Sequence, residues 1–106
     1  MTRVEFTKNI TKLIACMFLE KENPIIDYVK RSDTEQMTLF MEGKSKCDGI
    51  HNISQHQLGK ACDIYFLTDD GTKLTEPKKG HEYWHQYWTE HFGGAEAIPW
   101  DLGHYE

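Results

Sequence analysis

The stretch Lys60-Ala-Cys-Asp-Ile-Tyr-Phe-Leu67 decides the fold of this chain. Its continuous apolar and aromatic run predicts a buried strand. The run ends at Thr68-Asp-Asp-Gly71, whose Asp-Gly step is typical of a hairpin turn. Asp63 lies inside the predicted strand, where a carboxylate costs free energy unless it is paired or holds a metal. The same eight residues therefore predict the centre of a sheet and a functional acid.

Helical and extended patterns flank this strand along the chain. The expected elements are a helix over about residues 4–21, a strand over 25–29, a helix from the Ser32 capping box to Gly43, a loop over 44–55, a return arm over 73–75, a helix from Pro77 to Gly93-Gly94, and a strand over 102–106. In the second helix, Met37, Phe40 and Met41 are expected to face the core. The fold class predicted is α+β, with helices flanking a small and largely antiparallel sheet. We expect one domain covering residues 1–106.

Composition excludes several classes of protein. The net charge is −5 and no basic cluster is present, which argues against a nucleic-acid partner. The chain has no C-x-x-C pair among its cysteines, which are Cys16, Cys47 and Cys62. Neither a thiolate zinc site nor a disulfide framework is therefore indicated. Leu13 to Leu19 is too short to span a bilayer and does not have the pattern of a signal peptide. We expect a monomer made in the cytoplasm without membrane insertion.

Two histidines and an acid at separated positions point to a metal. His56 precedes the central strand, Asp63 lies within it, and His104 lies in the last predicted strand. Two imidazoles and one carboxylate, with a fourth position left for water, are typical of a catalytic zinc site. Gly59 is expected to form a tight turn between the first two ligands. The sequence therefore predicts Zn²⁺ bound by His56, Asp63 and His104.

The segments around these residues resemble one known family. The pattern SxHxxGxAxD is met by Ser54, His56, Gly59, Ala61 and Asp63, and the ending Trp100-Asp-Leu-Gly-His-Tyr-Glu106 is similar to the family's WD-x-x-H-[FY]-E. Upstream, Lys30-Arg31-Ser-Asp-Thr-Glu-Gln36, Leu39-Phe40 and Gly43-Lys-Ser45 resemble its third segment, with Lys30 in place of an aromatic residue. The family is that of zinc D-Ala-D-Ala carboxypeptidases and L-alanyl-D-glutamate endopeptidases, which includes many phage endolysins and shares its fold with the hedgehog signalling domain.

The resemblance implies a role for each site residue. Asp101 would be the general base, and Arg31 would stabilise the oxyanion. Substrate contacts are expected from Ser54, Gln36 and Trp100. Glu106 is a competing base, or it orients His104 from the same face of the strand.

The function implied is hydrolysis of amide bonds in peptidoglycan stem peptides. The enzyme would be either an L-alanyl-D-glutamate endopeptidase or a D,D-carboxypeptidase. The lack of a signal peptide favours a phage or prophage endolysin that reaches the cell wall after release. A non-catalytic zinc-binding domain of the same fold is the alternative from another class.

A second zinc motif lies in the helix that follows Pro77. His81-Glu-Tyr-Trp-His85 is an HExxH sequence, which would use His81 and His85 as ligands and Glu82 as base. Trp88 stands where the longer form of this motif has glycine. On a helical wheel the two histidines lie at the edge of an arc formed by Tyr83, Trp84, Tyr87, Trp88 and Phe92. A core-packing helix is therefore favoured, and the zincin reading remains an alternative.

Overall fold

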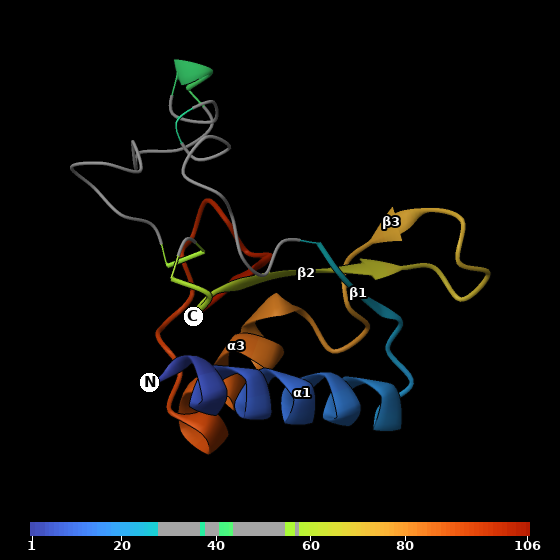
Figure 1. The fold of residues 1–106 in the computed structure, drawn as a ribbon. Helices are drawn as coiled ribbons and strands as arrows, with labels where there is room; N and C mark the ends of the chain where they lie inside the picture. The colour runs from blue at the N-terminus through green and yellow to red at the C-terminus, as the bar shows by residue number, and fades with distance from the viewer. Residues whose placement is uncertain (28–36, 38–40, 44–54, 57) are drawn as a thin grey trace.

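The computed structural model describes residues 1–27, 37, 41–43, 55–56 and 58–106. Its elements are α1 (Arg3–Leu19), β1 (Pro24–Ile26), β2 (Cys62–Leu67), β3 (Leu74–Thr75), α3 (His81–Phe92) and β4 (His104–Tyr105), shown in Figure 1. The four strands form one small antiparallel sheet, and both helices lie on one side of it. The predicted α+β class is confirmed. No helix of the described part is long and apolar enough to cross a membrane.

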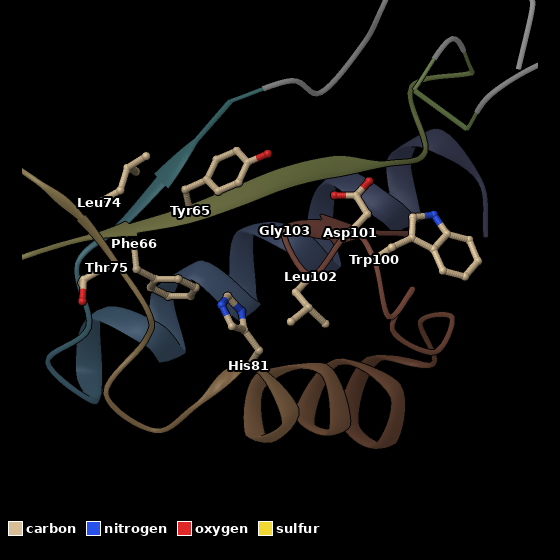
Figure 2. A pocket seen from close by; sticks show the side chains of 9 residues that line it. All are labelled: Tyr65, Phe66, Leu74, Thr75, His81, Trp100, Asp101, Leu102 and Gly103. Atoms are coloured by element: carbon tan, nitrogen blue, oxygen red, sulfur yellow. The ribbon is translucent and has the colours of Figure 1, made fainter. Parts of the chain in front are cut away.

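The central strand has neighbours on both edges. β1 pairs with β2 along one edge, whereas β3 and β4 share the other, at Phe66–Leu67 and at Cys62–Asp63 respectively. Side chains alternate along β2, so Ile64 and Phe66 point toward the helices and Tyr65 points away, as Figure 2 shows for Tyr65 and Phe66. Asp63 therefore lies on the face of β2 opposite the helices.

Helix α1 forms as its pattern predicts and supplies one wall of the core. The Thr2 hydroxyl accepts a hydrogen bond from the backbone N–H of Glu5 at 3.1 Å, and the Glu5 carboxylate accepts one from the backbone N–H of Thr2 at 3.0 Å. Both helices pack onto Ile64 and Phe66 of β2 and Tyr105 of β4. The buried residues that they contribute are Phe6, Ile10, Leu13, Met17, Trp84 and Trp88.

The start of α3 differs from the prediction. Pro77 does not open the helix: residues 77–80 form a turn closed by a hydrogen bond from the Gly80 N–H to the Pro77 carbonyl, and the helix begins at His81. Gly80 has φ of +89°, which is incompatible with a helical residue. The predicted stop is confirmed, because Gly93 caps the helix in the left-handed conformation.

The buried face of α3 is also rotated relative to the predicted arc. Trp84, His85 and Trp88 are buried, whereas Tyr83 is 39% exposed. His85 is therefore a core residue and not a border histidine. One of its two ring nitrogens, Nε2, has a hydrogen-bond partner inside the protein, as described below.

The second predicted helix falls almost entirely outside the described residues. Met37 and Met41 are helical, but Met41 is 75% exposed and not in the core as expected. The predicted loop over residues 44–55 is described at residue 55 alone.

A buried carboxylate ties the two helices together. Glu22, which is 5% exposed, accepts hydrogen bonds from the backbone N–H groups of Lys78 and Lys79 and from Trp84 Nε1, at 2.7, 3.1 and 2.7 Å. The N–H groups of Lys78 and Lys79 thus have an acceptor in Glu22. In a helix starting at Pro77, the same two N–H groups would lie in the first turn and would have no partner within the helix. Glu22 thus fixes the turn before α3 against the end of α1.

Replacing Glu22 by alanine is expected to lower the free energy of unfolding by about 3 kcal/mol, since it leaves three donors without their charged acceptor. Glu20→Ala is the control, because Glu20 makes a partly exposed ion pair with Lys79 that is worth less than about 1 kcal/mol. Urea unfolding followed by tryptophan fluorescence would measure both. Equal losses in the two variants would contradict the role assigned to Glu22.

Candidate metal centre

The first candidate ligand, His56, is placed by a tight turn ahead of β2. The Gly59 N–H bonds to the His56 carbonyl at 3.2 Å, and the Lys60 N–H bonds to the Gln55 carbonyl at 2.9 Å. Gly59 has φ of +69°, a conformation that residues with a Cβ rarely adopt. The predicted turn is confirmed, and it directs His56 back toward β2.

The other two candidate ligands, Asp63 and His104, are placed by strand register. Asp63 of β2 lies directly opposite His104 of β4 in the antiparallel pair. Directly opposite residues project from the same face, so the carboxylate and the imidazole meet on the side away from the helices. The adjacent pair, Cys62 and Tyr105, faces the core instead. A shift of one residue in this register would separate Asp63 from His104.

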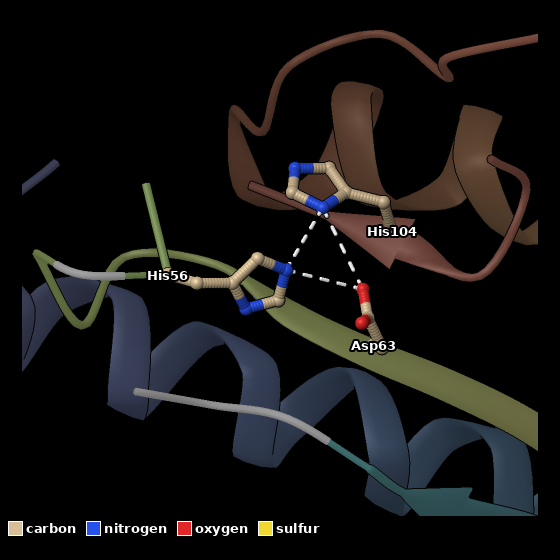
Figure 3. A group of neighbouring side chains, drawn as sticks. All are labelled: His56, Asp63 and His104. Carbon is tan, nitrogen blue, oxygen red and sulfur yellow. Dashed lines mark hydrogen bonds and ion pairs between the residues drawn. The ribbon is translucent and has the colours of Figure 1, made fainter. Parts of the chain in front are cut away.

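Three donor atoms converge at this point, as Figure 3 shows. His56 Nε2 lies 3.1 Å from His104 Nδ1 and 3.2 Å from Asp63 Oδ1, and the last two atoms are 3.6 Å apart. Donors on a tetrahedral Zn²⁺ with bonds of about 2.0–2.1 Å are separated by about 3.3 Å. Within the described ranges this is the one group of three or more histidine, cysteine or acidic side chains with ligand atoms close enough to share an ion. The predicted convergence is confirmed, and the spacing fits a metal ion.

The electrostatics of the group suit a cation. Burial opposes ionisation of Asp63, but hydrogen bonds from His104 and His56 outweigh it and hold the pKa of Asp63 below its ordinary value. Burial also opposes protonation of His104, yet its contacts with Asp63 and Glu106 raise its pKa. His56 and Asp63 are only 4% and 7% exposed. The protein thus keeps the negatively charged Asp63 carboxylate beside two imidazoles, in a site that is largely shielded from water.

Glu106 lies at the outer nitrogen of His104. Its Oε2 is 3.4 Å from His104 Nε2, while Nδ1 of the same ring faces the donor group. This confirms that Glu106 shares a face with His104, and the contact matches the carboxylate that commonly orients a metal-ligating histidine. His56 Nδ1 is buried and has no hydrogen-bond partner among the described residues.

Trp100 and Asp101 line a cavity of about 350 Å³, whose wall includes Gly103, the residue before His104 (Figure 2). The cavity lies along the edge of β2 between β3 and the loop before β4; its other lining residues are Tyr65, Phe66, Leu74, Thr75, His81, Leu102 and Gly103. Trp100 is 75% exposed, which excludes a core role. Asp101 does not belong to the donor group itself. It is held before His104 by a turn in which the His104 N–H bonds to the Asp101 carbonyl at 3.1 Å.

Among the cavity residues that were not anticipated from the sequence, two lie close to the donor group along the chain. Tyr65 follows Asp63 by two positions and so shares its face of β2, and the period of the strand could have revealed it. Gly103, next to His104, lies under the Tyr65 ring: a Cβ there would come within 2.9 Å of Tyr65 Cε1. The close approach explains why the smallest residue precedes the ligand.

The three other predicted site residues, Arg31, Gln36 and Ser54, lie outside the described residues.

The HExxH motif does not form a metal site in the described part of the chain. His85 Nε2 donates a hydrogen bond to the Leu102 carbonyl at 2.7 Å, and Glu82 is exposed. His81 lines the cavity, and no third donor joins it and His85 in a group of the required spacing among these residues. The helix therefore serves packing.

Comparison with protein-family models, with curated proteins and with solved structures gave no match to this chain.

Proposed function

We propose that this protein is a zinc peptidase that hydrolyses an amide bond in the peptide stems of bacterial peptidoglycan, as an L-alanyl-D-glutamate endopeptidase or a D,D-carboxypeptidase. The observation that carries the proposal is the convergence of His56, Asp63 and His104 with donor separations of 3.1–3.6 Å. The choice of substrate rests on the sequence resemblance, and so does the assignment to a phage or prophage lysis enzyme.

The donor set fits zinc better than calcium or magnesium. Two imidazoles disfavour these hard cations, which prefer oxygen ligands, whereas two histidines and one carboxylate are a common zinc set. When bound, Zn²⁺ lowers the pKa of a coordinated water to about 7 and polarises a substrate carbonyl. His56, Asp63 and His104 would hold the ion and leave one position for water.

Proton transfer and stabilisation of the developing charge are assigned to two further side chains. Asp101 accepts a proton from the attacking water and returns it to the leaving amine. Arg31, assigned from the resemblance, stabilises the negative charge that develops on the carbonyl oxygen. The cavity lined by Tyr65 and Trp100 adjoins Asp63 and His104 in the chain, so a peptide residue next to the cleaved bond has a place to bind.

Clearing of permeabilised bacterial cells would test the proposal. We expect turbidity to fall on addition of the protein, EDTA to stop the fall, and Zn²⁺ to restore it. Mass spectrometry of the released muropeptides would then identify the bond from its new termini. A protein that binds zinc but releases no new peptide termini would instead be a non-catalytic zinc-binding domain.

Zinc should stabilise the protein more at pH 8 than at pH 5.5. Lowering the pKa of Asp63 gives a stability contribution that is present above its ordinary value of 3.8, and raising the pKa of His104 gives one that is lost as pH rises through the raised value above 6.5. The metal-free cluster is thus most favourable between about pH 4 and 6.5. Zinc needs neutral imidazoles, so protons compete with it in that range. Thermal unfolding with and without Zn²⁺ measures the difference, and an equal shift in Tm at both pH values would contradict it.

A further inference from the structure

Helix α3 contacts the segment that carries His104 through the buried side chain of His85. His85, 4% exposed, donates from Nε2 to the carbonyl oxygen of Leu102 at 2.7 Å. Its ring also stacks on Tyr105, with ring centres 4.2 Å apart and an angle of 4° between the planes. Leu102 and Tyr105 stand two residues before and one residue after the ligand His104. One imidazole therefore touches the chain on both sides of a metal ligand.

The protonation state of His85 suits this contact. A carbonyl oxygen only accepts hydrogen bonds, so Nε2 carries the hydrogen. Burial lowers the pKa of His85, which leaves the ring neutral near pH 7. A neutral ring adds no positive charge beside a site built for a cation. The neutral His85 ring can therefore hold residues 101–105 in place without repelling a bound cation.

The loop that His85 fixes also carries the proposed base. Asp101 precedes Leu102 directly, and the His104 N–H bonds to the Asp101 carbonyl. Gly103, between Leu102 and His104, accepts a hydrogen bond from the Ile64 N–H at 2.8 Å, but it has no side chain to restrict its dihedral angles. The hydrogen bond at Leu102 limits the remaining backbone freedom on the N-terminal side of His104, and the stack at Tyr105 limits it on the other side.

We infer that His85 is a positioning residue of the metal centre, holding the backbone of residues 101–105 so that His104 meets His56 and Asp63. The inference rests on the proposed zinc site and assigns the second histidine of the HExxH motif a task other than ligation. A second tie from the same helix, from Trp88 Nε1 to the Glu106 carbonyl at 3.1 Å, holds the chain two residues after His104.

The test compares two variants at this position. His85→Gln can keep a donor near the place of Nε2, whereas His85→Phe keeps an aromatic ring against Tyr105 and removes the donor. Zinc affinity, measured at 20 °C by competition with a chromophoric chelator, is expected to fall about 10-fold or more in His85→Phe, as for other groups that orient metal ligands. His85→Gln should recover most of the loss.

Two controls separate positioning from simple destabilisation. Leu13→Ala removes a fully buried side chain of α1 and should lower Tm while zinc affinity stays unchanged. His91→Phe makes the same substitution at an exposed position of α3 and should change neither. If folded His85→Phe and His85→Gln bind zinc as tightly as the wild type, the inference is wrong. If the wild type binds no zinc, the proposed metal site itself is wrong.

Discussion

Replacing His56 and His104 together by alanine is expected to reduce bound zinc from one ion per chain to none. Both side chains supply a nitrogen to the group of three donors, and the remaining Asp63 offers a single carboxylate. One carboxylate does not hold Zn²⁺ against buffer, whereas three protein ligands are the usual minimum in catalytic sites. Metal analysis after dialysis measures the stoichiometry, and hydrolysis of the cell wall should disappear with the metal.

The double variant leaves a buried carboxylate without its two histidines, which threatens folding. Asp63→Asn provides a second route to the same test, because it keeps the shape of the side chain and removes the charge. We expect this variant to remain folded by circular dichroism and to bind zinc far more weakly.

His81→Ala is the matched control, since it removes a histidine of the competing motif. Here we expect one zinc ion per chain, as in the wild type. If the His56/His104 variant still binds zinc and His81→Ala does not, the metal site lies on α3 and the assignment is wrong.

The agreement between sequence and structure is closest where the pattern is local. The apolar run from Cys62 to Leu67 forms the predicted strand, and the alternation of its side chains puts Asp63 on the face opposite the core. The turn at Gly59 was likewise visible, because glycine between two candidate ligands indicates an unusual backbone angle.

The predictions that proved wrong concern contacts between distant segments. Pro77 is a common first residue of a helix, but Gly80, with φ of +89°, separates the turn at Pro77 from α3. Glu22, more than fifty positions earlier, binds the backbone of this turn. The helical wheel places His85 at the border of the buried arc, whereas the structure buries it. Its hydrogen-bond partner, the Leu102 carbonyl, lies 17 positions away and no periodic pattern reveals it.

Asp101→Asn is expected to retain zinc and to lose activity by about 10²–10⁴-fold, the usual contribution of a general acid–base group. Zinc should remain because Asp101 is not one of the three converging donors. Activity should fall because an amide cannot accept the proton from water, although it fills the same space on the wall of the cavity.

The comparison with Glu106→Gln decides between the two candidate bases. The Glu106 carboxylate is 3.4 Å from His104 Nε2, on the side of the ring away from the other ligands, where it can orient the imidazole. Its loss should therefore weaken zinc binding by about 10-fold or more and lower the rate mainly through lost metal. At saturating zinc the Glu106→Gln protein should recover most of its rate, whereas the Asp101→Asn protein should not. The reverse outcome, a rate restored by zinc in Asp101→Asn but not in Glu106→Gln, would assign the proton transfer to Glu106.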